Sequence, residues 1–502
     1  METGKFFITL QNLSPQELLR FGEFVASPFF NKNKELIRLY SIILRQTELQ
    51  KEITREKLFA LLYRNKPYDA RRMTDLIYYL NNLLEEFVAT ERSKKDVFTR
   101  NLAFFSEARE RDIDKVVLSV AREMNAQLET SRIRDNEYYY HNYLFNNEQD
   151  KFFSAKGKIK QDQSLQKKSD NFDIFFLSAK LQDACEMLNR GQIVHAVYED
   201  NILEKLLEHI EEYKAKYAGI PVISVYLNIL KMLRNPADET YLHNLLTLLA
   251  HHGNIFEKLE LRDLYNYAQN YCIRRINAGE TAYMQTLFDI YKELLKDNLI
   301  FQGKHLTKWD YKNIISLGLR LKEYEWTLKF IQDYKNKLPD NEGDNAYTYN
   351  LANYYYETGD YKKAVKLLRN VEFTDVYYNL DSKTMLLKIY YDTEEDENLI
   401  SLVAAFKIYL KRNKLISEAN HTLYRNLLKY TVKVLNLNNK LPYQRGRHFV
   451  KQLALIKKQI TDNQNIANKK WLLAQIEAIG KEKEKVKEKE KKQTARKKAV
   501  SA

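Results

Sequence analysis

Apolar residues recur every three or four positions along most of this chain, which is the spacing of one face of an α-helix. A clear helix start is Ser14-Pro15-Gln16-Glu17, where the serine and the glutamate have the spacing of a capping box and the proline suits a first turn. The apolar positions that follow are Leu18, Leu19, Phe21, Phe24 and Val25. A second helix is expected after the Asn31-Lys32-Asn33 loop. The pattern predicts an all-α protein.

The same spacing predicts a series of further helices up to about residue 299. The expected helices cover residues 54–63, 69–89, 112–129, 136–153, 172–188, 202–217, 222–233, 239–250 and 259–275. Glycine and proline mark the breaks between them, including one at Gly191. Residues 151–170 hold six lysines against two aspartates with little apolar periodicity, so we expect a solvated loop or a frayed helix end there.

Residues 346–371 have the spacing of two antiparallel helices joined by a short turn. Gly359-Asp360 forms the predicted turn, and the small residues Ala352 and Ala364 stand where the two helices would cross. The other inward positions are Leu351 and Tyr355 on the first helix, and Tyr361, Val365 and Leu368 on the second. Similar units precede and follow it, over residues 308–339 and up to residue 406. Tyr355 and Tyr390 are 35 residues apart, and so are Ala364 and Leu399.

This unit resembles the tetratricopeptide repeat (TPR), a helix pair of about 34 residues that stacks on its copies around one shared core. The resemblance is best at residues 308–406 and implies a solenoid-like array of antiparallel helix hairpins. Two units depart from the family pattern. The middle unit has Thr348 where the family has a bulky aromatic residue. The third unit has no turn glycine and has Leu399 at the helix crossing.

The resemblance implies a groove that binds an unidentified protein or peptide and is lined by residues of each first helix. The candidates are Trp309, Lys312, Arg320, Tyr349, Asn350, Asn353, Tyr356, Lys388 and Tyr391. Some relatives bind the terminal carboxylate of a peptide there, and Lys312 and Asn350 match that clamp. Ser316, Asp381 and Met385 do not match it, and Asp381 would repel a carboxylate, so we expect a generic groove. The alternative is that these residues form an ordinary solvated face.

Composition supports the prediction of a helical protein and weakens the case for a surface specialised in nucleic-acid binding. Only 13 glycines and 7 prolines occur in 502 residues, so helix breakers are scarce. The net charge is +14, to which the stretch 481–498 contributes +6 through ten Lys or Arg and four Glu. The remaining excess is dilute, which favours a moderately basic body over a dedicated nucleic-acid surface.

Nucleic-acid binding is the alternative function, through a helix-turn-helix-like segment at residues 54–89 or through the basic tail. In the segment, Arg71 and Arg72 are followed by Asp75, which would repel phosphate. The apolar residues Met73, Leu76, Ile77, Leu80, Leu83, Leu84, Phe87 and Val88 predict a wide buried face there. We therefore expect this segment to be structural.

The sequence gives no positive sign of an enzyme, a cofactor or a metal site. It lacks the common phosphate-binding, zinc-protease and nucleophile motifs. Cys185 and Cys272 stand alone in apolar patterns, which indicates buried thiols in a reducing compartment. No stretch approaches the ~18 apolar residues of a membrane span. We expect a cytoplasmic, non-enzymatic scaffold or adaptor.

These patterns divide the chain into five expected regions. They are an N-terminal helical region at 1–95, an irregular helical array at 96–300, TPR-like repeats at 301–413, closing helices at 414–479 and a charged tail at 480–502.

The predicted register of the repeats can be tested at Ala364. Replacing Ala364 by Trp forces a large ring into a close helix crossing, and overpacking of this kind costs about 1–3 kcal/mol of folding free energy. We expect a lower midpoint in urea unfolding followed by circular dichroism. An unchanged midpoint would show that the register is wrong.

Overall fold

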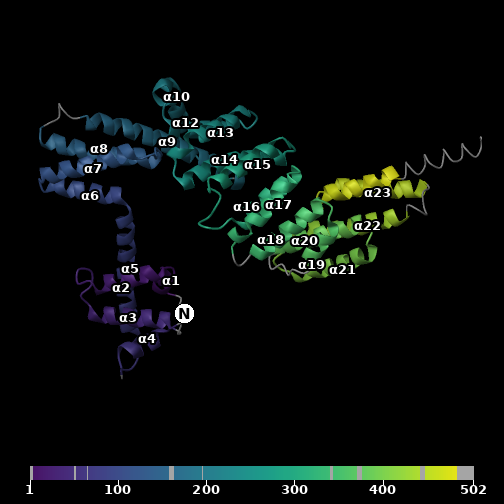
Figure 1. The fold of residues 1–502 in the computed structure, drawn as a ribbon, viewed down its shortest axis with the longest axis horizontal. Coiled ribbons are helices and arrows are strands. Elements are labelled where there is room, and N and C mark those ends of the chain that lie inside the picture. The colour runs from purple at the N-terminus through teal and green to yellow at the C-terminus, as the bar shows by residue number, and fades with distance from the viewer. Residues whose placement is uncertain are drawn as a thin grey trace, which may run out of the picture. The chain divides into compact units, whose positions relative to one another are not determined.

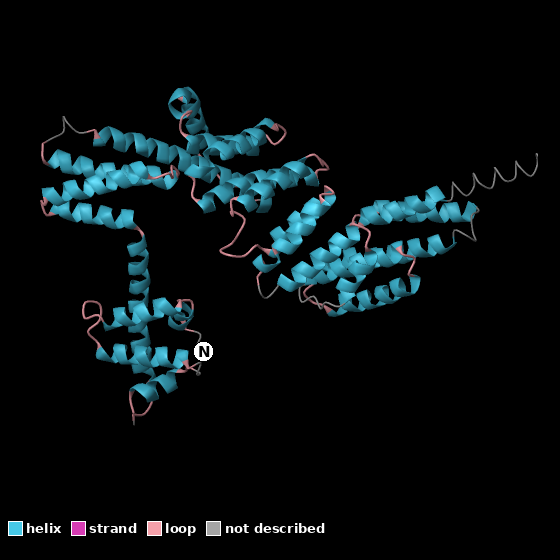
Figure 2. Ribbon diagram, viewed as in Figure 1, coloured by secondary structure: helices cyan, strands magenta, loops and turns pink. Residues whose placement is uncertain are grey.

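The structure is a computed structural model, and it describes residues 4–49, 53–64, 66–157, 163–194, 196–339, 343–369, 376–440 and 447–482. Helices and loops make up this part of the chain, without a β-strand (Figure 2). The prediction of an all-α protein is confirmed. The helices form two compact units, Met1–Glu257 and Lys258–Ala502, and their order along the chain is shown in Figure 1.

The first unit runs from α1 to α13. Its helices are α1 (Lys5–Gln11), α2 (Pro15–Ala26), α3 (Lys34–Glu48), α4 (Arg55–Leu62), α5 (Ala70–Lys95), α6 (Val97–Glu110), α7 (Asp114–Thr130), α8 (Asn136–Ala155), α9 (Ser164–Val194), α10 (Leu203–Glu212), α11 (Lys214–Tyr217), α12 (Pro221–Arg234) and α13 (Thr240–His252). Helix α2 begins as the sequence predicts. The Glu17 N–H donates to Ser14 Oγ at 3.3 Å, and the Ser14 N–H donates to Glu17 Oε2 at 2.9 Å.

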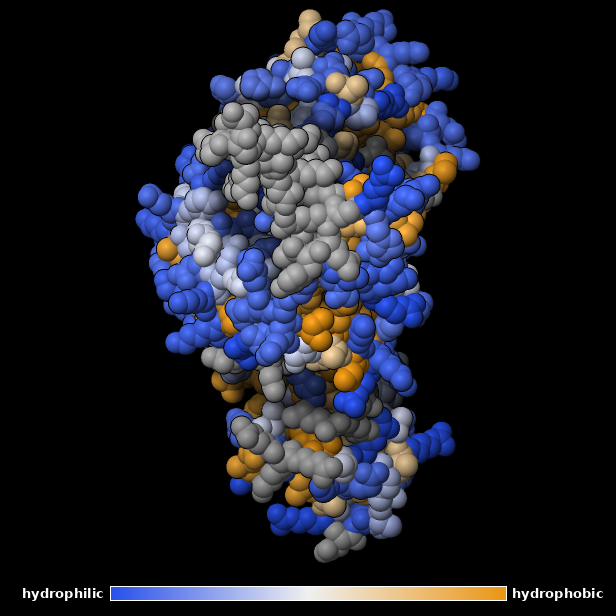
Figure 3. All heavy atoms as spheres, turned by 90° about the vertical axis from the view of Figure 1, so that its right-hand side faces the viewer, coloured by the Kyte–Doolittle hydropathy of each residue, from blue (hydrophilic) through white to orange (hydrophobic). Residues whose placement is uncertain are grey.

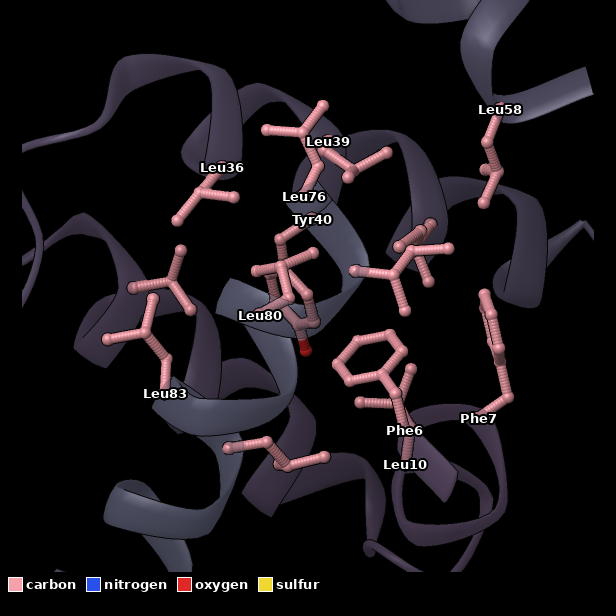
Figure 4. Close-up of a cluster of buried hydrophobic side chains, with 14 of the residues drawn as sticks. Phe6, Phe7, Leu10, Leu36, Leu39, Tyr40, Leu58, Leu76, Leu80 and Leu83 are labelled. Atoms are coloured by element: carbon pink, nitrogen blue, oxygen red, sulfur yellow. The ribbon is translucent and has the colours of Figure 1, made fainter. Parts of the chain in front are cut away.

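Helix α5 is the centre of the N-terminal core, because α1, α2, α3 and α4 all pack on it. Figure 4 shows apolar side chains of α1, α3, α4 and α5 pointing toward one another. The predicted buried face of α5 is confirmed at Met73, Leu80 and Leu84, which have no exposed surface. It is wrong at Val88, which is 42% exposed beyond the point where the core ends.

In the second half of the first unit the structure differs from the sequence predictions within residues 151–170 and at Gly191. Residues 151–155 and 164–170 are helical, because α8 and α9 pack on each other, while residues 158–162 lie outside the described part. Two lysines of this stretch form ion pairs: Lys151 lies 2.5 Å from Glu148, and Lys168 lies 3.1 Å from Asp150. The predicted break at Gly191 is also wrong, since α9 continues to Val194.

The second unit is a run of helices in which each packs on the next along the chain. They are α14 (Lys258–Asn277), α15 (Tyr283–Lys296), α16 (Lys308–Arg320), α17 (Tyr324–Asp333), α18 (Gly343–Glu357), α19 (Tyr361–Arg369), α20 (Val376–Asp392), α21 (Asp396–Arg412), α22 (Glu418–Lys440), α23 (Arg447–Asp462) and a last helix at 469–482. Helix α16 also packs on α18, and α18 on α20, so the first helices of successive pairs are neighbours.

Three helix pairs, α16–α17, α18–α19 and α20–α21, occupy the stretch where the sequence predicts three consecutive units. Each pair turns at one residue in the left-handed backbone region: Lys322 (φ 63°), Gly359 (φ 83°) and Glu394 (φ 58°). Ala352 and Ala364 have no exposed surface, as expected for a close crossing. The TPR-like solenoid and the five-region division remain predictions.

Gly318 in α16 allows a close approach of the two helices in its pair. A Cβ atom at Gly318 would lie 2.3 Å from Thr327 Oγ1 and 3.4 Å from Phe288. That hydroxyl donates to the Glu323 carbonyl oxygen at 2.6 Å, so it cannot easily turn aside.

We expect Gly318→Ala to lower the free energy of unfolding by about 1–3 kcal/mol, because a buried contact must be forced apart. The control is Gly480→Ala, where the nearest atom to the new Cβ lies 3.8 Å away and alanine suits a helix better than glycine. Urea unfolding of both full-length variants measures the difference. Equal stability of the two would contradict the close approach.

Candidate protein-binding site

The nine candidate residues come together on three neighbouring helices of the second unit. Helix α16 carries Trp309, Lys312 and Arg320, and α20 carries Lys388 and Tyr391. Helix α18, which packs on both, carries Tyr349, Asn350, Asn353 and Tyr356. The stacking therefore brings positions that are up to 82 residues apart in the chain, from Trp309 to Tyr391, onto one set of helices.

An ion pair joins the first and third of these helices. Lys312 Nζ lies 2.6 Å from Asp381 Oδ2, with the two side chains 21% and 33% exposed. The ammonium group also lies 5.3 Å from the ring centroid of Tyr349 and 5.4 Å from that of Tyr378, within the range of cation–π attraction. These two rings meet edge to face at 5.0 Å. Lys312 therefore interacts with side chains of the same protein, and Asp381 offsets its positive charge.

Three of the nine candidates lie inside the helix stack. Tyr349 is 7% exposed, Tyr391 is 8% exposed, and Asn350 has no exposed surface. Asn350 Nδ2 donates to the Ala346 carbonyl oxygen of its own helix at 2.8 Å. The ring of Trp471, from the helix at 469–482, meets Tyr391 edge to face at 5.3 Å. A partner cannot reach these three side chains unless the stack opens.

The other candidates keep accessible surface. Trp309 is 46% exposed, and the ammonium groups of Lys308 and Lys312 lie 5.6 Å and 5.9 Å from its ring centroid. Arg320 is exposed at the end of α16. The remaining four are half-buried: Lys312, which is already paired with Asp381, and Asn353, Tyr356 and Lys388. We call the other five residues, Trp309, Arg320, Asn353, Tyr356 and Lys388, the accessible strip.

Partial burial perturbs the charged groups beside the strip. Burial lowers the pKa of Lys388, while the negative charges of Glu357, Asp392 and Asp381 raise it. Burial has the opposite effect on a carboxylic acid and raises the pKa of Asp392, which accepts a hydrogen bond from Gln475 Nε2 at 3.2 Å. A half-buried ammonium group among carboxylates can donate to the polar backbone or the acidic groups of a partner.

Sequence reasoning placed Asp381 at a groove position but did not assign the acidic neighbours Glu357 and Asp392 to the site. Asp392 is four residues after Lys388, which is about one helical turn and therefore the same face of α20. That spacing is a signal that could have placed it there. Tyr424, from α22, has no such local signal; burial and the charge of Asp381 raise its pKa to about 12.

One arginine of the helix-turn-helix-like segment, Arg72, is hydrogen-bonded to other side chains of the protein. Arg72 donates to Glu35 at 2.8 Å and to the Tyr63 hydroxyl oxygen at 2.9 Å. Tyr63 in turn donates to Glu35 Oε2 at 2.6 Å. Arg71 is exposed at the start of α5. The basic tail from residue 483 lies outside the described residues, so both parts of the nucleic-acid alternative stay predictions.

The part of the chain that the structure describes has neither a cluster of metal ligands nor a membrane-spanning helix. There, no group of three or more His, Cys, Asp or Glu side chains could hold a metal ion, and no helix is long and apolar enough to cross a membrane. Cys185 and Cys272 are free and buried, as their apolar surroundings in the sequence predict. Burial raises the pKa of the Cys272 thiol to about 12.

Comparisons with family models, with curated proteins and with solved structures gave no match for this chain. The TPR resemblance therefore depends on the residues quoted above and remains a prediction.

The ion pair between α16 and α20 can be tested by a double-mutant cycle. Lys312→Met leaves the Asp381 carboxylate half-buried without its partner, and Asp381→Asn does the converse, so each alone should destabilise the protein. Since both side chains keep some solvent exposure, we expect a coupling free energy of about 0.5–1.5 kcal/mol. Urea unfolding of the two single variants and the double variant measures it, and a coupling near zero would contradict the pairing.

Proposed function

We propose that this chain is a non-enzymatic scaffold or adaptor that binds a protein or peptide along the accessible strip of α16, α18 and α20. The observation that supports this most is the exposure of Trp309, at 46%. Tryptophan, tyrosine and arginine are the residues that most often dominate interface energetics, because each buries a large area while keeping a polar group. The strip has one of each.

The strip offers two kinds of contact to a partner. Trp309 offers an apolar ring beside the ammonium group of Lys308, whereas the charge of Lys312 is already offset by Asp381. Asn353, Tyr356 and Lys388 offer hydrogen-bonding groups that are already half-buried. We expect the partner to place an apolar side chain on Trp309 and polar groups near Lys388.

Exposed large apolar residues are spread over many helices, which favours recognition through a few specific residues rather than through a broad apolar surface. On the face of the molecule drawn in Figure 3, hydrophilic residues predominate and hydrophobic ones appear in small patches. Scattered exposed apolar residues of this kind are normal for a protein surface. Binding would then depend on a few residues, which makes single substitutions informative.

The proposal includes a cytoplasmic location. It is supported by Cys185 and Cys272, which are free and have no exposed surface. Structural disulfides are typical of oxidising compartments, whereas unpaired buried thiols are common in reducing ones.

We expect the double substitution Trp309→Ala/Arg320→Ala to weaken partner binding by at least about tenfold, since one interface hot spot is worth about 2 kcal/mol or more. Both side chains are exposed, so stability should change little. The matched control is Ile408→Ala/Arg412→Ala, which removes an exposed apolar residue and an exposed arginine from α21. The measurement is quantitative capture of partners from lysate, with intact protein and both variants at equal concentration.

A further arm removes residues 483–502 and repeats the capture at low and moderate salt. Binding along the strip should survive both changes, whereas binding through the basic tail should weaken with each. Retention of every partner by Trp309→Ala/Arg320→Ala, together with loss in the tail deletion, would refute the proposal and favour the nucleic-acid alternative.

A further inference from the structure

A separate pocket of about 470 Å³ lies in the second unit, away from the residues of the accessible strip. It is formed by the first turn of α14, by the loop that follows α15, and by the short 3₁₀ helix η3 (Lys335–Lys337). Its volume is within the range of about 300–1,000 Å³ that small-molecule sites occupy.

The charged residues that line this pocket all have the same sign. They are Lys258, Lys304 and Lys337, one from each of the three walls, and no carboxylate is among the described lining residues. None of the three lysines forms an ion pair with a described residue. A cleft lined by one sign of charge concentrates the electric field and attracts counter-ions, here anions.

Backbone hydrogen bonds hold two of the walls in place before any ligand binds. The Gln302 N–H donates to the His305 carbonyl oxygen at 2.8 Å, which closes the loop that carries Lys304. The Leu306 N–H donates to the Lys337 carbonyl oxygen at 2.7 Å, which ties that loop to η3. A site whose walls are already ordered loses less entropy when a ligand binds.

The pocket also has apolar walls, so its fit is not limited to a small inorganic ion. Leu259 is 68% exposed at the start of α14, next to Lys258. Phe301, from the loop that follows α15, also lines the pocket, and its ring stacks on that of Tyr334 with centroids 6.2 Å apart. An organic group could lie between these side chains while an attached anion meets the lysines.

We propose that this pocket binds a small organic phosphate of about the size of a nucleoside triphosphate. The phosphate oxygens would accept hydrogen bonds from the ammonium groups of Lys258, Lys304 and Lys337, which are charge-assisted contacts. The organic part would pack on Leu259 and Phe301. This inference uses none of the residues of the accessible strip, so either proposal can be wrong without affecting the other.

The test is isothermal titration calorimetry of the full chain with three probes: ATP, inorganic triphosphate and adenosine. We expect ATP to bind most tightly, triphosphate more weakly because it lacks the organic part, and adenosine not measurably. The triple variant Lys258→Gln/Lys304→Gln/Lys337→Gln should weaken ATP binding by at least roughly tenfold.

The control variant is Lys329→Gln/Lys366→Gln/Lys407→Gln, which removes the same charge from three exposed lysines elsewhere in the second unit. It should bind ATP like the intact protein. An equal loss in both variants would show attraction to the overall charge and overturn the site. Absence of ATP binding would overturn it too, and triphosphate binding as tight as ATP would refute the contact with Leu259 and Phe301.

Discussion

Each helix of this protein must bury its apolar face, and for nearly all of them the partner is a close neighbour along the chain. In the second unit α14 packs on α15, α15 on α16, and so on to α23. In the N-terminal core α2 packs on α3 and α3 on α4, and all of the first four helices also pack on α5. Each of these helices therefore depends on its neighbours for the burial of its apolar face.

The pairing of Lys312 with Asp381 is a departure from this local pattern that shapes the candidate site. It connects residues 69 positions apart and crosses the face of α18 between them. Because the pair neutralises Lys312 and surrounds it with aromatic rings, the centre of the predicted groove is occupied by the protein's own side chains. What a partner can reach is the margin of that cluster, where Trp309 and Lys388 keep accessible surface.

The sequence predicted the helices well because amphipathic spacing is a local property, visible within one or two turns. It failed where a distant segment decides the outcome. Residues 164–170 appeared to be a loop or a frayed helix end, but they belong to α9, which packs on α8, and Lys168 pairs with Asp150. Tyr391 appeared to face a groove, but Trp471, 80 residues later, covers it. Helical periodicity gives the direction of a side chain, not what lies in front of it.

The left-handed turn residues have a consequence for how such helix pairs are recognised. The same backbone conformation occurs at Lys322, Gly359 and Glu394, although only one of them is the glycine that this conformation favours. The cost of about 1 kcal/mol for a side chain there is small compared with the packing of two helices. A search keyed to a turn glycine would therefore find only one of the three helix pairs between Lys308 and Arg412, although all three turn through the same backbone conformation.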